Sequence, residues 1–168
     1  MQLTSAQAGK LLRKLNEEYN MILQEEEQSR EFVVSIQEDP EDARPAYDML
    51  DTLARLKALE KKIRTVRHAL NVFNTTHTVP GFDMTVGQVL VYLPQLTALK
   101  YRLSAMSKKL PKKRVDPTYR SGNLVEYTYV NYDIDQARAM LSDVNDELGR
   151  LQLALDEVNA HETMEIDL

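Results

Sequence analysis

The chain has 168 residues and no cysteine, which excludes disulfide bonds, zinc–thiolate sites and cysteine nucleophiles. Glycine and proline are scarce, at 5 and 6 residues, whereas charged residues make up 28% and hydrophobic residues 43% of the chain. This composition is typical of long helices rather than of a β-sandwich or β-barrel. Because the hydrophobic fraction can build a core and the length suits one domain, we expect a single helical domain over residues 1–168.

Long apolar runs are also missing. The longest one, residues 89–93, falls far short of the roughly 20 residues that a transmembrane helix requires. The first ten residues contain no apolar stretch behind a basic start, so they do not resemble a signal peptide. We therefore expect a soluble, cytoplasmic protein, with secretion left as the alternative.

Sequence motifs for catalysis and cofactor binding are absent as well. The three histidines are His68, His77 and His161, and none has the Glu-x-x-His spacing of di-metal helical bundles. The chain contains neither a Gly-x-Ser-x-Gly nucleophile motif nor a glycine-rich phosphate loop. The acidic groups at 25–27 and 143–147 are interpreted as solvated helix faces rather than as metal ligands. We therefore predict a non-enzymatic protein without catalytic residues, metal or cofactor.

Apolar residues at alternating intervals of three and four residues predict two long helices in the first half of the chain. The first pattern starts after a capping residue at Thr4 or Ser5 and continues through Val33 and Ile36, which predicts a helix over residues 5–37. Two prolines then break the helix, and the next one is predicted over residues 46–74. A short loop between two long helices implies antiparallel packing.

A third helix is predicted over residues 85–110, where Thr85 and Gln88 have the spacing of a capping box. Pro94 lies inside this segment and removes one backbone donor, which predicts a kink or a delayed helix start. Residues 89–93 are rich in β-branched and aromatic side chains, so a short strand is the competing prediction there.

The last helix, predicted over residues 133–159, has the clearest pattern in the chain. Its apolar stripe is about two residues per heptad wide, which is typical of a coiled-coil seam or of a bundle helix that fits one groove. From this uninterrupted seam we predict a homo-oligomer. The predicted oligomer seam consists of Ile134, Leu141, Val144, Leu148, Leu151, Leu155 and Val158.

Between the last two helices the hydrophobic period changes to two. Val125, Tyr127 and Tyr129 alternate with other residues, and turn-forming residues at 121–123 precede them. This pattern predicts a β-hairpin over residues 112–131. The predicted fold class is therefore all-α in the main: an antiparallel bundle of long helices, or coiled-coil hairpins, with one small inserted β-hairpin.

A cluster of basic residues stands next to this hairpin and its tyrosines. Basic side chains interleaved with aromatic ones can hold a nucleic-acid strand, and they can also bind an anionic membrane. The alternative, which we favour, is that the cations complement the end of a helix dipole and protect an exposed strand edge from aggregation. The net charge of −5 agrees with this alternative. The basic cluster consists of Lys108, Lys109, Lys112, Lys113 and Arg114.

Several short segments carry a resemblance to a known family. Residues 70–74 look like a hydrophobic-Asn-x-x-Asn segment that closes a helix, and residues 85–99 like the threonine-capped helix that follows it. Residues 119–134 resemble a tyrosine-rich hairpin that leads into an Asp-capped helix. Residues 155–159, together with 167–168, resemble the pattern that closes the sequences of the family. On these segments the chain resembles the septicolysin-like family of small, largely uncharacterised bacterial helical proteins. The resemblance implies a helical bundle, and the family label implies a pore-forming protein.

Three functions therefore stay open at the level of sequence. The first, which the seams and the missing chemistry favour, is a self-associating structural or interaction protein. The second is a membrane-active or pore-forming protein, for which the amphipathic segment 86–110 is the candidate. The third is weak binding of anions or nucleic acid through the basic cluster.

Overall fold

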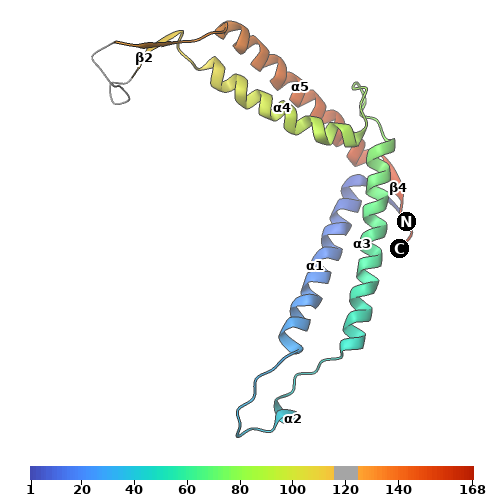
Figure 1. Ribbon diagram of the computed structural model, residues 1–168. Helices are drawn as coiled ribbons and strands as arrows, with labels where there is room; N and C mark the ends of the chain where they lie inside the picture. Colours follow the sequence, from blue (N-terminus) through green and yellow to red (C-terminus); the bar gives the residue numbers. More distant parts are fainter. Residues whose placement is uncertain (116–124) are drawn as a thin grey trace. The chain divides into compact units, whose positions relative to one another are not determined.

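The computed structural model describes residues 1–115 and 125–168 and shows a mainly α-helical chain with small β-strands (Figure 1). This confirms the predicted fold class, a mainly-α fold with a small β insert. The helices are α1 (Ser5–Ser29), α2 (Pro40–Ala43), α3 (Met49–Thr76), α4 (Val86–Ser107) and α5 (Ile134–His161). The strands are β1 (Gln2–Thr4), β2 (Lys112–Arg114), β3 (Tyr127–Tyr129) and β4 (Thr163–Glu165).

The chain divides into two compact units. Unit 1 consists of residues 1–77 and 157–168, and unit 2 consists of residues 78–156. The helix α5 begins in unit 2 and ends in unit 1, so the two units share one continuous helix. Whether they fold together as the expected single domain stays a prediction.

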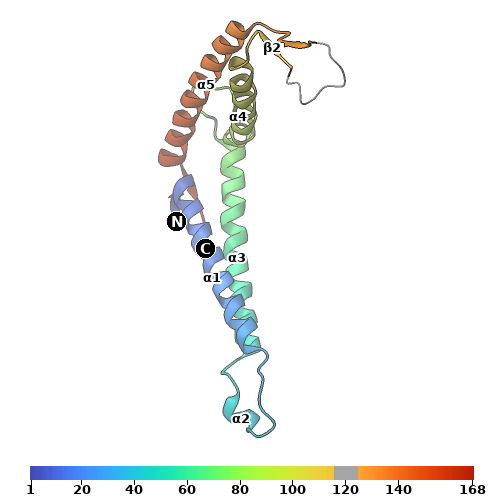
Figure 2. The same ribbon diagram turned by 90° about the vertical axis from the view of Figure 1, so that its left-hand side faces the viewer.

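Unit 1 is built on an antiparallel pair of helices, α1 and α3, which lie side by side in Figures 1 and 2. Thr4 begins α1 as predicted: its hydroxyl accepts from the amide of Gln7 at 3.3 Å, and the Gln7 side chain accepts from the amide of Thr4 at 3.0 Å. Buried residues recur every seven positions along both helices, which places one apolar stripe of each against the hairpin interior. They are Ala8, Leu15 and Ile22 in α1, and Leu59, Val66 and Phe73 in α3.

The predicted end of the first helix is wrong, because α1 stops at Ser29 and not near residue 37. Val33 and Ile36, predicted to continue the seam, are 99% and 102% exposed. The apolar stripe is interrupted by the polar Glu26 and Ser29, so a longer helix would gain no burial to offset the entropy of ordering. The β-branched residues that follow also favour an extended backbone over a helix.

The second helix begins later than predicted, at Met49 instead of residue 46. The side chain of Asp48 fixes this start, because its carboxylate accepts hydrogen bonds from the amides of Leu50 and Asp51 at 2.9 and 3.0 Å. The helix also runs past the predicted residue 74 to Thr76. The loop between α1 and α3 is consequently longer than expected.

A small sheet that the sequence pattern did not predict ties the two chain ends together. β1 and β4 pair antiparallel, with Leu3 opposite Met164. Met1 and Ile166 exchange two hydrogen bonds: the Met1 ammonium group donates to the Ile166 carbonyl at 2.7 Å, and the Ile166 amide donates to the Met1 carbonyl at 2.9 Å. Met164 and Ile166 are buried, so this sheet contributes to the core of unit 1.

In unit 2, the helix α4 starts as predicted at the capping box of Thr85 and Gln88, with hydrogen bonds of 2.8 and 3.3 Å. The helix is continuous from Val86 to Ser107, so the alternatives of a short strand over residues 89–93 and of a start delayed to Pro94 are wrong. It ends before the predicted residue 110, since Pro111 disfavours helical dihedrals at the residue before it.

The helix α5 packs antiparallel to α4, as Figures 1 and 2 both show. Asp133 caps α5, accepting from the amides of Asp135 and Gln136 at 2.8 and 3.1 Å. Two hydrogen bonds connect the pair: the Tyr92 hydroxyl donates to Glu147 at 2.8 Å, and the Tyr132 hydroxyl donates to the Met106 carbonyl at 3.0 Å.

The predicted β-hairpin is present between α4 and α5. β2 and β3 pair antiparallel, with Lys112 opposite Tyr129 and Arg114 opposite Tyr127. The predicted turn at 121–123 lies outside the described residues.

Candidate interaction site

The predicted oligomer seam on α5 is largely used by the fold of the single chain. Most of its residues are at most 7% exposed, whereas Ile134 and Leu141 are half-buried. A side chain that is buried within its own chain cannot also contact a second copy without unfolding. The predicted homo-oligomer stays a prediction, for which these buried side chains offer little free surface. The buried seam residues are Val144, Leu148, Leu151, Leu155 and Val158.

The structure brings part of the basic cluster together with the predicted tyrosines. Lys112 lies with its Nζ atom 4.1 Å from the ring centroid of Tyr127 and 5.3 Å from that of Tyr129. Because residues opposite each other share one face of the ribbon, Lys112, Arg114 and the two tyrosines all lie on one face. Lys112 covers ring surface that a stacked base would need. Edge protection and anion binding both stay predictions.

The other basic residues are spread around this ribbon. Lys113 pairs with Thr128 on the opposite face. Lys108 caps the end of α4, and Lys109 follows it, where cations interact favourably with the helix dipole. All five basic residues are exposed.

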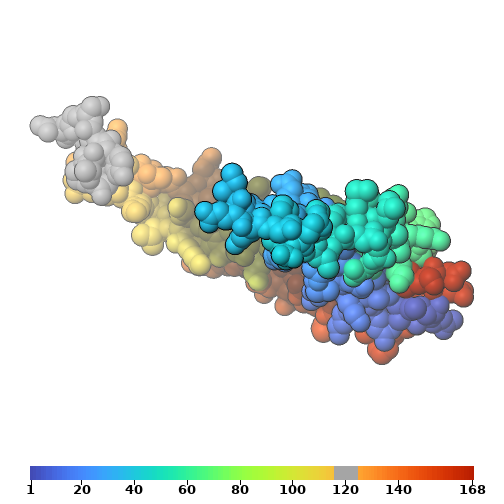
Figure 3. All heavy atoms as spheres, turned by 90° about the horizontal axis from the view of Figure 1, so that it is seen from below, coloured from blue at the N-terminus to red at the C-terminus, as the bar shows by residue number. Residues whose placement is uncertain are grey.

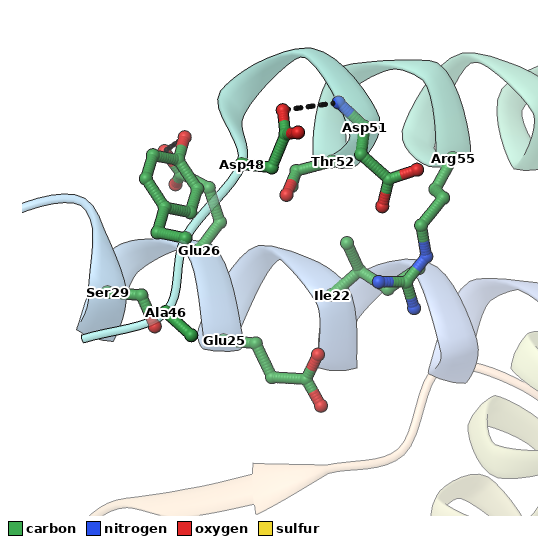
Figure 4. A pocket seen from close by; sticks show the side chains of 10 residues that line it. Ile22, Glu25, Glu26, Ser29, Ala46, Asp48, Asp51, Thr52 and Arg55 are labelled. Carbon is green, nitrogen blue, oxygen red and sulfur yellow. Dashed lines mark hydrogen bonds between the residues drawn. The ribbon is translucent and has the colours of Figure 1, made fainter.

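An acidic pocket of about 340 Å³ lies between α1 and the start of α3 (Figure 4). Its walls include Glu25 and Glu26 from one side and Asp48, Asp51 and Arg55 from the other. Two of its acidic groups already have structural partners. Asp48 caps α3, and Glu26 accepts a hydrogen bond from the Tyr47 hydroxyl at 3.3 Å. Within residues 1–115 and 125–168, no group of three His, Asp or Glu side chains is placed to hold a metal ion.

Two hollows lie along α3, from its middle to its C-terminal end, and share Thr65 and Asp167 in their walls. The first, of about 380 Å³, lies between α3 and β4, and the second, of about 420 Å³, reaches Lys61 and Lys62. We call these two adjoining hollows the α3–β4 groove. Its apolar wall residues are Ala69, Val72 and Phe73 of α3 with Met164 and Ile166 of the C-terminal segment.

Two histidines also line this groove. The His77 ring stacks on Phe73 with 4.0 Å between ring centroids, and its Nδ1 atom lies 3.1 Å from the Phe73 carbonyl oxygen. His77 therefore packs against the end of α3, whereas His68 is exposed at the surface.

The loop between α1 and α3 forms an exposed apolar surface at the other end of unit 1. Val33 and Ile36 are fully exposed, and Leu50 at the start of α3 is 73% exposed. In Figure 3 the light-blue and cyan atoms of this end lie nearest the viewer, uncovered by the rest of unit 1. We call residues 31–36, Glu-Phe-Val-Val-Ser-Ile, the apolar loop.

Sequence reasoning missed this surface because it assigned the apolar loop to a buried seam. The available signal was the polar interruption at Glu26 and Ser29, after which the periodic residues no longer had a partner helix.

Three tyrosine hydroxyls are held by glutamates or by burial. A hydrogen bond to Glu60 raises the pKa of Tyr19, and a hydrogen bond to Glu147 raises the pKa of Tyr92. Burial, followed by the charge of Glu26, raises the pKa of Tyr47. These phenols consequently keep their protons at neutral pH and act as hydrogen-bond donors between helices, not as bases.

Comparison with known proteins adds information on the fold alone. No family model matches the chain, and no curated protein matches it. A solved structure from Corynebacterium diphtheriae, described as a functionally unknown conserved protein, is similar at a TM-score of 0.63. The two sequences are 15% identical, and the match covers 98% of this chain and 100% of the other. Among the described residues, no helix is long and apolar enough to span a membrane. Membership of the septicolysin-like family stays a prediction.

Proposed function

We propose that this protein is a non-enzymatic interaction protein that self-associates through the apolar loop of unit 1. The observation that carries the proposal is the full exposure of Val33 and Ile36. Burying one such side chain stabilises a protein by about 1.5–3 kcal/mol, so a chain that leaves two of them in water forgoes this gain as a monomer. A group of exposed apolar residues of this kind is typical of a contact surface.

The neighbouring residues extend this surface. Met49 and Leu53 are 54% and 44% exposed, and with Leu50 they follow the loop into the first turns of α3. Acidic residues lie at both ends of this surface: Glu31 is the first residue of the loop, and Glu38 follows it. An apolar centre with a charged rim is the usual composition of a protein–protein interface.

The α5 seam does not support association in the same way, because its residues are already buried within the chain. The polar pocket residues also support interaction rather than catalysis, since Glu26 and Asp48 are engaged in contacts that hold the fold together.

Sedimentation velocity over a range of protein concentrations tests the proposal. The wild-type chain is expected to form dimers or larger species as concentration rises, and the double variant Val33→Ser with Ile36→Ser to remain monomeric. Both residues are exposed, so the variant should keep its helical circular dichroism. Val91→Ser with Leu153→Ser is the matched control, because these residues are 61% and 73% exposed in unit 2. A wild-type chain that is monomeric at every concentration would contradict the proposal.

A further inference from the structure

The strand β4 has an open outer edge. In an antiparallel pair, residues that exchange two hydrogen bonds alternate with residues that exchange none. Met1 and Ile166 exchange both bonds, so the register makes Leu3 and Met164 the next pair that exchanges two hydrogen bonds. The backbone N–H and C=O of Glu165 therefore point away from β1. In the part of the chain that the structure describes, β1 is the only strand that pairs with β4.

The α3–β4 groove runs beside this open edge, since Glu165 itself is part of its wall. Between Ala58 and Thr76, the first and last α3 positions in its walls, the helix covers about 27 Å. A strand of six residues spans about 20 Å. The groove therefore offers backbone partners on one side, an apolar helix face on the other, and room for a short added strand.

The apolar loop has the properties that such a strand needs. It is outside any helix or strand in its own unit, and its valines, isoleucine and phenylalanine favour strands. In an extended conformation Phe32, Val34 and Ile36 project from the same face. Three apolar side chains would then lie against Ala69, Val72 and the buried Phe73 of the groove, which would remove them and the 46% exposed Val72 from water.

In its own chain the loop lies away from the apolar end of the groove. The helix α1 has 25 residues and is about 37 Å long. The loop follows its C-terminal end, whereas β1 precedes its N-terminal end and pairs with β4 (Figures 1 and 2). Within unit 1 the apolar end of the groove, at Phe73 and Met164, is thus at the other end from the loop, so the loop of a second copy supplies the strand.

Charge indicates the direction of the added strand. Asp167 lies in the hollow beside Lys61 and Lys62, whereas Met164 lies in the hollow with Phe73. A strand antiparallel to β4 would therefore place its first residue, Glu31, beside the two lysines and its last, Ile36, at the apolar end. Lys61 and Lys62 outnumber Asp167 at this end of the groove, and antiparallel pairing is the slightly more stable arrangement, so both favour that direction.

We propose that the α3–β4 groove binds the apolar loop of a second copy of this chain as an added antiparallel strand. The inference rests on the proposed self-association and assigns to it the receiving site. The apolar loop and the groove are different parts of unit 1, so the contact is heterologous. It can form either as two reciprocal contacts in a dimer or as an open chain of copies.

A synthetic peptide of residues 30–37 tests the receiving site directly. It is titrated into the full chain carrying Val33→Ser with Ile36→Ser, whose own loop no longer competes. We expect saturable binding and slower hydrogen exchange of the Glu165 amide, because that N–H gains a partner. The control is the same peptide with Val33→Pro. Val33 lies on the other face from Phe32, Val34 and Ile36 and its N–H points toward β4, so this change removes a backbone donor and the peptide is expected not to bind. No change at Glu165 on adding the unmodified peptide would overturn the inference.

Groove variants of the full chain separate this inference from the proposed function. Val72→Arg places a charge in the groove at a residue that is 46% exposed, so the fold should tolerate it. We expect it to weaken self-association by about tenfold or more, whereas Asn71→Arg, at the exposed neighbouring position outside the groove walls, leaves association unchanged. If the wild-type chain associates and Val72→Arg associates equally well, the groove is not the receiving site, and the proposed self-association through the apolar loop is still supported. If the wild-type chain does not associate, the proposed function itself is wrong.

Discussion

The two units use the same plan for their helix pairs. In each, a Thr-x-x-Gln capping box starts the first helix, and a tyrosine of that helix donates to a glutamate of the antiparallel partner. The capping boxes are Thr4–Gln7 and Thr85–Gln88, and the tyrosine–glutamate pairs are Tyr19–Glu60 and Tyr92–Glu147.

The units differ where each helix pair is connected. Residues 31–48 of unit 1 carry six acidic side chains and one basic, together with the exposed Val33 and Ile36. Residues 108–115 of unit 2 carry five basic side chains and no acidic one, and they lead into a β-ribbon. Apolar stripes form the core in both units, so the cores do not distinguish them. The connections, and not the cores, are therefore where the self-association and anion-binding hypotheses both apply.

The largest expected effect tests whether the two units unfold together. Leu151 is fully buried in the part of α5 that belongs to unit 2, and Leu151→Ala should cost about 2–5 kcal/mol of unfolding free energy. Because α5 continues into unit 1, we expect a single thermal transition at a lower midpoint, measured by calorimetry. Leu153→Ala, at a residue that is 73% exposed, is the control and should change stability by less than about 0.5 kcal/mol. Two transitions, of which only one moves, would show that the units fold independently.

The features that the sequence predicted well are those in which local side chains determine the structure. Thr85 with Gln88, and Asp133 before α5, start their helices because a nearby side chain satisfies free amides of the first turn. The alternation of Tyr127 and Tyr129 likewise predicted a strand that the structure shows. Pairing of that strand with β2 needs only a connection close in sequence.

The features that the sequence could not predict depend on partners distant along the chain. Val33 and Ile36 continue the period of α1, but periodicity alone does not show whether an apolar surface lies opposite. β4 has only three residues, and the hydrogen bond from Met1 to Ile166 joins groups 165 residues apart. The α3–β4 groove exists only once that pairing has formed, so no local pattern could indicate it.

A charge reversal in unit 2 tests the other connection. Lys112→Glu with Lys113→Glu should promote aggregation, because within residues 1–115 and 125–168 each strand of the ribbon pairs only with the other and leaves an edge that the lysines protect. Loss of the cation–π contact of Lys112 removes about 0.5–1 kcal/mol of local stability. Light scattering measures the aggregation, and Lys10→Glu with Lys14→Glu, exposed on α1, is the control of equal charge.

Fluorescence polarisation with a labelled single-stranded oligonucleotide distinguishes edge protection from anion binding by the basic cluster. We expect no binding by the wild-type chain and none by the variant. Sub-micromolar binding that the two substitutions abolish, and that salt weakens steeply, would instead establish an anion-binding patch.

The smallest effect concerns the tyrosine–glutamate hydrogen bond, of which each unit has one. Glu147 accepts from Tyr92 and raises the pKa of its hydroxyl above the ordinary value of about 10. A raised pKa means that the fold favours the neutral phenol. The stability contributed by this bond is therefore complete below pH 10 and is lost as the pH rises through the folded pKa. Tyr92→Phe should cost about 1 kcal/mol or less at neutral pH, since the bond is only partly buried. Its alkaline absorbance titration should lack one late-titrating tyrosine.

The titration of Tyr19→Phe should likewise lack one late-titrating tyrosine, because the hydrogen bond to Glu60 raises the pKa of Tyr19 in unit 1. An early-titrating phenol at either position would show that this tyrosine does not bind its glutamate in solution, and would end the likeness between the two helix pairs.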